Sequence, residues 1–308
     1  MSLIALLIGL VIERLATQIF HWRRMRFMDR IIDAGFGYAD RFKQWPPVVP
    51  VIVLALLLAL PVFIVIVALG DALLGFPYLI LAIVVLFFSL GPNDIGEDVG
   101  EYCAALEEDD EEILQQKARA LVEADVPVDT LECIQAVESA VFVQANNRLY
   151  AIIFWFVVLG PFGPLGAWLY RSTDLIRRRA VFSAARAEEE SEIESKTRIR
   201  DAAVTLHGWL AWIPARLTAV GYAIAGHFDA AFAAWRKHPE PAPETPSEAS
   251  EELLARVGIG ALALHDQPDE DLKERGVRGA TAANRLVFRL LVIWAVIIAA
   301  LTLYGWTV

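Results

Sequence analysis

Four carboxylates that follow an uncharged apolar run are the first residues whose spacing suggests a chemical site. Asp94, Glu97, Asp98 and Glu101 recur at i, i+3, i+4 and i+7, which places side chains on one face of a helix. Oxygen ligands suit Mg²⁺, so one interpretation is a divalent-cation site that holds a substrate phosphate. The simpler interpretation is that acidic residues in a first turn complement the helix dipole and face water. Both interpretations stay open, and we assign no metal ligand.

Motifs for other common chemistries are absent from the chain. There is no G-x-x-x-x-G-K-[ST] loop, no G-x-G-x-x-G after a strand, no H-E-x-x-H and no G-x-S-x-G element. The five histidines are too scattered along the sequence to indicate a zinc site. The sequence therefore predicts no catalytic residue, no metal ion and no cofactor. Whether the protein is an enzyme is left undecided, and a protein without catalytic activity is favoured.

Hydrophobicity is concentrated in blocks. The 308-residue chain is 56% hydrophobic, with a mean hydropathy of +0.47. Uncharged blocks cover 51–70, 72–91, 149–170 and 290–308, and a bilayer core needs roughly 20 apolar residues of helix to cross it. We expect an all-α integral membrane protein with four to five membrane-embedded helices and a helical cytoplasmic lobe.

Two further apolar blocks contain ionisable residues. Residues 3–20 include Glu13 and Arg14, and residues 202–228 include Arg216 two positions after Pro214. Either these blocks pack inside or along the membrane surface, or they bring functional charges into the bundle. An arginine in a membrane-associated helix needs a carboxylate or an anion. Glu13 is the candidate partner for Arg216, and the alternative is that Arg216 snorkels to the lipid headgroups.

The charge distribution predicts sidedness. The net charge is −11, and residues 92–147 hold fifteen Asp and Glu against Lys117 and Arg119 only. Nucleic acid is excluded as the main ligand, because phosphate contacts need the opposite sign. Seven basic residues between Arg14 and Lys43 predict a cytoplasmic loop by the positive-inside rule. The blocks 51–70 and 72–91 then go out and return, which leaves 92–148 in the cytoplasm.

The block 149–170 conflicts with a simple span, because eight basic residues lie in 171–200. The sequence GPFGPLG at 160–166 interrupts a helix, since proline removes a backbone donor. A re-entrant hairpin that keeps 171–200 cytoplasmic is favoured over a full span. Residues 238–250 (HPEPAPETPSEAS) are predicted to be an exposed linker.

Five regions follow from this organisation. They are the N-terminal membrane helices with a basic loop (1–91), an acidic cytoplasmic helical lobe (92–148), membrane, re-entrant and amphipathic helices with a basic segment (149–228), a linker with short amphipathic helices (229–285), and a C-terminal transmembrane helix (286–308).

Several longer motifs are similar to a known family. Glu13-Arg14, GPNDIGEDVGEY at 91–102, FVQANNRLYAIIFWFVVLGPFGPLGAWLYR at 142–171 and WIPARLTAVGYAIAGHF at 212–228 resemble the AmpE family over nearly the whole chain. The resemblance implies a multi-pass protein of the bacterial inner membrane, linked to β-lactamase induction and cell-wall stress signalling. It implies a regulatory or sensory role without catalysis.

A more distant similarity connects the chain to the CobD/CbiB adenosylcobinamide-phosphate synthases. IPARLTA at 213–219 is similar to a synthase motif. The two aspartates and the asparagine that the synthases carry before this motif correspond here to His207, Gly208 and Ala211, and their E-N-x-x-D element corresponds to Val143, Gln144 and Asn147. Their N-T-L-D is reduced to Arg171-Ser172-Thr173-Asp174. The departures imply that the synthase reaction is lost.

The alternative function is a membrane enzyme or a module that binds a small polar or phosphorylated metabolite on this scaffold. The expected partners are the lipid bilayer and such a metabolite, and the sequence identifies no protein partner. The candidate ligand or structural polar cluster consists of Glu13, Arg14, Asp94, Glu97, Asp98, Asn146, Asn147, Pro214 and Arg216.

Overall fold

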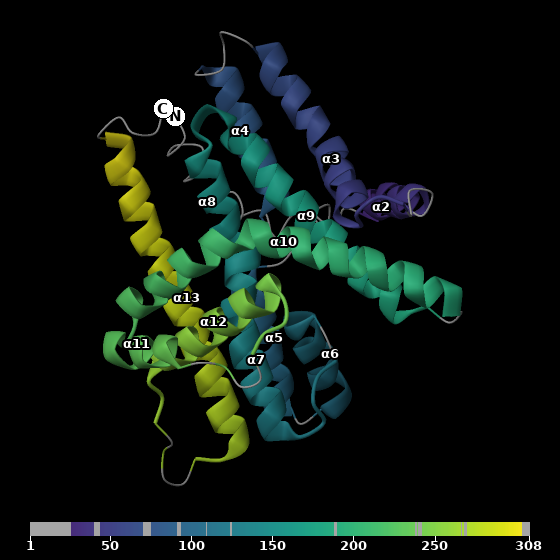
Figure 1. The fold of residues 1–308 in the computed structure, drawn as a ribbon. Helices are drawn as coiled ribbons and strands as arrows, with labels where there is room; N and C mark the ends of the chain where they lie inside the picture. The colour runs from purple at the N-terminus through teal and green to yellow at the C-terminus, as the bar shows by residue number, and fades with distance from the viewer. Residues whose placement is uncertain are drawn as a thin grey trace.

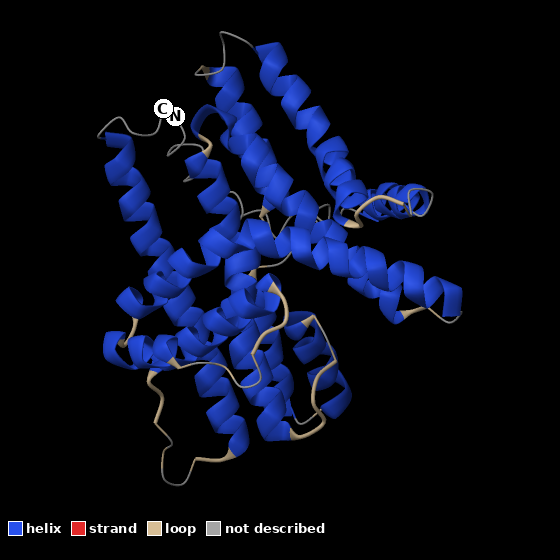
Figure 2. Ribbon diagram, viewed as in Figure 1, coloured by secondary structure: helices blue, strands red, loops and turns tan. Residues whose placement is uncertain are grey.

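The computed structural model describes residues 26–39, 44–69, 75–90, 94–108, 110–123, 125–187, 190–237, 239, 242–265, 267 and 270–303. Every regular element in these ranges is a helix (Figure 2). In chain order they are α2 (Arg26–Ala39), α3 (Val48–Leu69), α4 (Phe76–Ser89), α5 (Ile95–Glu108), α6 (Glu111–Val122), α7 (Thr130–Ala145), a π-helical turn (Asn146–Tyr150), α8 (Ala151–Val158), a 3₁₀ turn (Gly160–Phe162), α9 (Gly163–Ala185), α10 (Glu190–Ala225), α11 (Phe228–Arg236), α12 (Pro246–Leu262) and α13 (Leu272–Leu303). The predicted all-α fold is confirmed.

Three of the described helices are long and apolar enough to cross a membrane. They are Val48–Leu69, Thr130–Val158 and Leu272–Thr302, and the shorter apolar helix Phe76–Ser89 accompanies them. Much of the α3 surface is exposed and apolar, including Leu56, Leu57 and Ile64. A helix that exposes such a surface is stable in lipid rather than in water. The chain is therefore an all-α membrane protein.

The predicted interruption at 160–166 is a helical hairpin. Helix α8 ends at Val158, the chain turns through Gly160 at φ +54°, and α9 returns along α8 (Figure 1). The two helices are in close contact, because a Cβ on Gly163 would lie 2.3 Å from the Phe156 carbonyl oxygen and one on Gly166 would lie 2.6 Å from the Trp155 carbonyl oxygen. The apolar block therefore folds back on itself.

Two helices run through boundaries that the sequence suggested. The helix that begins at Thr130 continues through the π-helical turn to Val158, and α13 continues through 285 and 286. The predicted linker is shorter than 238–250, because α12 begins at Pro246 with Thr245 as its cap. Thr245 accepts a hydrogen bond from the Glu248 amide, and the Glu248 side chain accepts one from the Glu244 amide. The T-x-x-E spacing of a capping box is legible in the sequence, with the glutamate reaching the amide before the cap, and the linker interpretation overlooked it.

Helix α10 runs crosswise to α4 and α13 (Figure 1). Helices α5, α6 and α7 form the acidic lobe, which covers described residues between 94 and 148, and α5 and α7 pack on the N-terminal half of α13. One continuous core joins this lobe to α10, α12 and α13, and it includes Tyr102, Val137, Phe142, Tyr222 and Leu286. The fold thus holds the apolar hairpin, the crosswise helix and the acidic lobe together.

Candidate functional site

A buried carboxylate lies where the apolar part of the hairpin ends. The side chain of Asp174 on α9 has no exposed surface. It accepts hydrogen bonds from Arg171 Nη1, Arg177 Nη2 and Arg178 Nε, each at 2.9 Å. The spacing 171, 174, 177 and 178 places all four residues on one helical face. A single helix thereby surrounds one carboxylate with three guanidinium groups.

A second carboxylate reaches the same arginines from the acidic lobe. Glu123 follows the last residue of α6 in the left-handed conformation, at φ 59°. It accepts from Arg148 Nη2 at 3.1 Å and lies 3.4 Å from Arg177 Nη2, and it also pairs with Arg178 Nη1. Glycine is the usual residue in this conformation. Here a glutamate occupies the position, and its carboxylate pairs with the arginines.

The π-helical turn between α7 and α8 supplies the third group. Arg148 in this turn donates to Asp98 at 2.7 Å and to Gln144 at 2.9 Å. Beside it, Asn146 donates to Asn147 at 3.2 Å and accepts from Thr218 on α10 at 3.0 Å. A π turn changes which side chains of a helix face inward, and such turns are frequent at functional sites. Here it buries two amides and a guanidinium together.

We call these residues the arginine–carboxylate network. Its members are Asp98, Glu123, Arg148, Arg171, Asp174, Arg177 and Arg178. Helices α5, α6, α9 and the π-helical turn each contribute to it. The network therefore connects the hairpin with the acidic lobe.

The electrostatics of the network keep Asp174 and Glu123 ionised. Burial alone would raise the pKa of the Asp174 carboxyl, but the guanidiniums of Arg178, Arg177 and Arg171 outweigh burial and hold that pKa well below its usual range. The pKa of Glu123 is lowered in the same way, against burial, by Arg178, Arg177 and Arg148. Carboxylates held by several guanidiniums are poor general bases and poor metal ligands. Among the described residues, no group of three or more His, Cys, Asp or Glu could hold a metal ion.

Three guanidinium nitrogens of the network are buried without an acceptor. Arg171 Nε, Arg177 Nε and Arg178 Nη2 are buried without a hydrogen-bond partner. His207 on α10 lies 3.8 Å from Asp174, and burial lowers the pKa of its imidazole to about 3, so the ring is neutral. Buried donors without acceptors carry a desolvation cost. This arrangement favours an anion over a cation as a ligand.

The predicted carboxylate row does not converge. Asp94 precedes α5 and accepts a hydrogen bond from the Gly96 amide at 3.0 Å, and Glu97 is exposed. Asp98 turns inward to Arg148, whereas Glu101 forms an exposed pair with Lys117 at 2.6 Å. These residues therefore serve a helix start, the network and the surface separately.

The predicted residues near the IPAR sequence lie away from the network. Pro214 is buried within α10, and Arg216 is half-buried. The Arg216 guanidinium lies 3.9 Å from the centre of the Trp212 ring and donates to the Trp212 carbonyl oxygen at 2.9 Å. It also lies 3.4 Å from Ser250 Oγ on α12. Glu13 and Arg14 lie outside the described residues, so their pairing with Arg216 stays a prediction.

Sequence reasoning missed most of the network. Glu123, Arg148, Arg177 and Arg178 were absent from the predicted cluster, and Asp174 appeared only as a remnant of a synthase motif. One signal was available, because R-x-x-D-x-x-R-R directly after an apolar block places one acid among three bases on a helical face.

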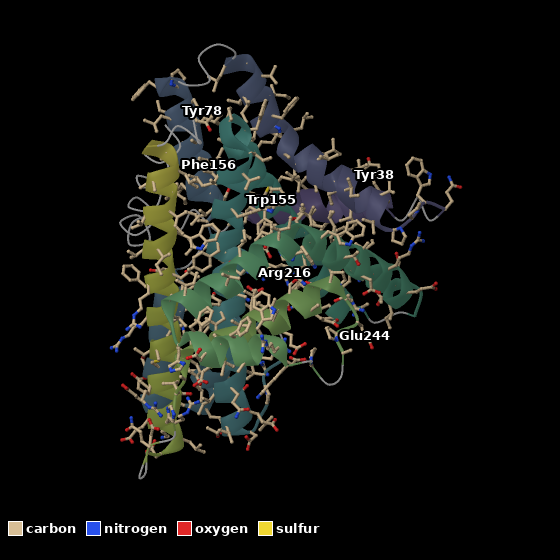
Figure 3. All side chains as sticks on the ribbon, turned by 60° about the vertical axis from the view of Figure 1, so that its left-hand side comes forward. Tyr38, Tyr78, Trp155, Phe156, Arg216 and Glu244 are labelled. Carbon is tan, nitrogen blue, oxygen red and sulfur yellow. The ribbon has the colours of Figure 1, made fainter. Side chains whose placement is uncertain are left out.

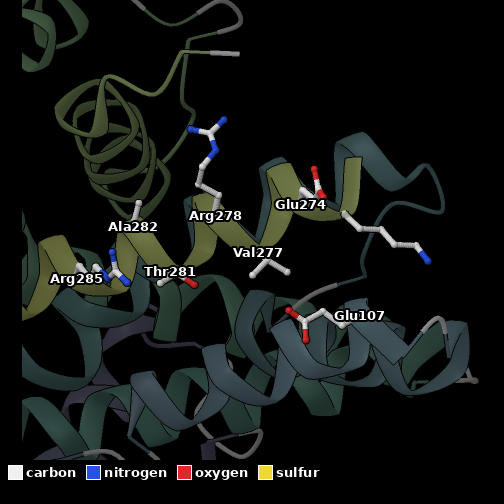
Figure 4. A pocket seen from close by; sticks show the side chains of 8 residues that line it. Glu107, Glu274, Val277, Arg278, Thr281, Ala282 and Arg285 are labelled. Atoms are coloured by element: carbon white, nitrogen blue, oxygen red, sulfur yellow. The ribbon is translucent and has the colours of Figure 1, made fainter. Parts of the chain in front are cut away.

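A separate surface pocket of about 570 Å³ lies between α5 and α13 (Figure 4). Its lining includes Glu107, Lys273, Arg278 and Arg285, and none of its lining residues belongs to the network. Its mixed charges do not favour an anion or a cation.

Comparison with known proteins agrees with the motifs. The family described as regulatory signalling modulator protein AmpE matches the chain over residues 1–308. Cobalamin biosynthesis protein CobD of Stutzerimonas stutzeri is 27% identical over 226 residues, which cover 69% of this chain and 68% of that protein. Its namesake in Chromobacterium violaceum is 27% identical over 187 residues, covering 60% of this chain and 55% of that protein. No solved structure matches. The chain therefore belongs to the AmpE family of regulatory signalling modulator proteins.

Proposed function

We propose that the protein is a multi-pass regulator of the bacterial inner membrane that takes part in β-lactamase induction and cell-wall stress signalling, and that it acts without catalysis. The family description supports a regulatory role. One observation carries the proposal: Arg177 and Arg178 contact both Asp174 of the hairpin helix and Glu123 of the acidic lobe. The ion pairs of these carboxylates thus join the hairpin helix to the acidic lobe.

The network suits transmission of a signal, because a small number of buried ion pairs forms the link between the hairpin and the acidic lobe. A displacement of the hairpin either carries Glu123 with it or separates Glu123 from Arg177 and Arg178. Removing one partner of a buried ion pair costs about 3–5 kcal/mol. This range is large enough to favour one of two arrangements of the lobe strongly. The basic residues between Arg14 and Lys43 support a cytoplasmic position for the lobe by the positive-inside rule.

The test compares β-lactamase induction in a strain that lacks the gene and in strains that carry Arg178→Gln or the matched surface variant Lys117→Gln. Both side chains belong to ion pairs, and only the first lies in the network. Loss of induction control with Arg178→Gln at normal membrane abundance supports the proposal. An unchanged induction profile in the deletion strain contradicts it.

A second function is favoured by the surplus donors of the network. Relatives named for cobalamin biosynthesis share the scaffold, and unpartnered guanidinium nitrogens suit an anion such as a phosphorylated metabolite. In this alternative the protein binds or modifies such a molecule. Rescue of a strain lacking adenosylcobinamide-phosphate synthase would establish the catalytic form of this alternative. If the gene fails to rescue the strain but phosphorylated metabolites raise the melting temperature of the protein, the protein binds such a metabolite without converting it.

A further inference from the structure

The C-terminal half of α10 exposes a continuous apolar face. Six large side chains on it are between 45% and 61% exposed: Trp209, Trp212, Ile213, Leu217, Val220 and Ile224. At 100° per residue they fall on one side of the helix. The opposite side is buried and includes Ala211, Ala215, Thr218 and Tyr222. The helix therefore packs on the protein through one side and presents large apolar residues outward on the other.

The depth of this apolar face relative to the membrane follows from the point at which α10 crosses α13. Gly221 lies against Leu290, because a Cβ on Gly221 would be 2.5 Å from Leu290 Cδ1. Leu290 is the first residue after Arg289, and no charged residue follows it in the chain. Helix α10 thus crosses α13 at the point where the charged half of α13 meets the apolar half of α13.

The contact between α10 and α9 indicates the same depth for α10 relative to the membrane. His207 of α10 lies near Asp174 of α9, and Arg171 is the first charged residue after the apolar hairpin. Two views show α10 crosswise to α13, with Arg216 on the crosswise helix (Figures 1 and 3). Crosswise helices at the boundary between apolar and charged segments are typical of the membrane–water interface.

Arg216 lies in the middle of the exposed face and stacks on Trp212. Tryptophan is enriched at the headgroup level of membranes, and arginine extends its charge to that level while its stem stays in an apolar surrounding. Helix α11 repeats the arrangement, with the Arg236 guanidinium 4.5 Å from the centre of the exposed Phe232 ring. Each of these two neighbouring helices thus pairs an arginine with an exposed aromatic ring.

We propose that residues 209–224 of α10, together with α11, lie in the lipid headgroup layer, and that Arg216 with Trp212 binds the phosphate of an anionic phospholipid. We assign lipid as the occupant, because the apolar half of α13, which begins at the crossing with α10, also exposes large apolar side chains, among them Val292 and Val296. A guanidinium complements a phosphate in charge and geometry. This inference rests on the membrane fold and is independent of the proposed signalling role.

The test uses the purified full chain in a neutral detergent. Phosphatidylglycerol, phosphatidylcholine and inorganic phosphate are titrated separately, and the melting temperature is recorded for the wild type, for Arg216→Gln and for the control Arg200→Gln, which lies in the polar half of the same helix. We expect phosphatidylglycerol to stabilise the wild type and the control, with about fivefold weaker apparent affinity for Arg216→Gln, from about 1 kcal/mol per basic residue near a membrane surface. Phosphatidylcholine and inorganic phosphate should produce no comparable shift.

Equal stabilisation of Arg216→Gln and the wild type by phosphatidylglycerol would overturn the proposal, as would an equal shift with inorganic phosphate, which would indicate a free-anion site. A second measurement is independent of the arginine variant. Lipids with shallow or deep quenchers in their chains are compared by the fluorescence difference between the wild type and Trp212→Phe. Stronger quenching by the shallow label supports the proposal, whereas stronger quenching by the deep label, or protection of Trp212 from both labels by a protein partner, contradicts it.

Discussion

Arg177 donates from one nitrogen, Nη2, to Asp174 at 2.9 Å and to Glu123 at 3.4 Å. The two acceptors come from different parts of the molecule, the hairpin helix and the end of α6. A single guanidinium thus bridges the hairpin helix and the acidic lobe. Because the side chain is mostly buried, solvent screens the interaction little.

Asp174→Asn should destabilise the protein strongly, because it removes a buried negative charge that pairs with Arg171, Arg177 and Arg178. The expected loss in the free energy of unfolding is about 3–5 kcal/mol. Denaturant unfolding in detergent micelles measures it. Lys117→Gln, which removes only an exposed pair, should change stability by less than about 1 kcal/mol. A loss with Asp174→Asn no larger than that of Lys117→Gln would contradict the buried network.

His207 should make stability depend on pH. Burial lowers the pKa of its imidazole to about 3 from 6.5, so below about pH 6.5 the unfolded chain binds a proton that the folded chain excludes. Stability is then fully present above pH 6.5 and is lost towards pH 3, at up to about 1.4 kcal/mol per pH unit. Melting temperatures at pH 7.5 and pH 5.5 should differ less for His207→Gln than for the wild type. The exposed variant His265→Gln should behave as the wild type.

The acidic lobe should be cytoplasmic. The native thiols are poor probes, because Cys133 is buried and Cys103 is half-buried. A cysteine at the exposed position Glu112 should react with an impermeant maleimide only after lysis, whereas one at Phe76, exposed at the start of α4, should react in intact cells. Labelling at position 112 before lysis would refute the topology.

Much of the fold followed from patterns within single segments. The apolar blocks predicted the helices α3 and α4 and the apolar half of α13, and the Gly-Pro steps at 160–166 predicted the hairpin, because both signals are local. The network did not follow, because Glu123 and Asp174 are 51 positions apart in the numbering and meet only through tertiary packing.

The carboxylate row shows the same limit at the level of one helix. Helical spacing placed Asp94, Glu97, Asp98 and Glu101 together, but Asp98 alone found a buried arginine. Asp98 lies on the core-facing side of α5 with Val99 and Tyr102. Its partner could not be predicted, because the π-helical turn that aims Arg148 inward leaves no clear signature in the sequence.

A double-mutant cycle on β-lactamase induction shows whether the Glu123–Arg178 contact transmits the signal. Glu123→Gln, Arg178→Gln and the double variant are expressed from the native locus, membrane abundance is verified, and induction by a β-lactam is measured. We predict that each single variant loses most of the regulatory effect and that the double variant is no worse than either, because all three remove the same link. Normal regulation in the single variants at normal abundance would show that the Glu123–Arg178 contact does not transmit the signal. Independent and additive losses in the double variant would show the same.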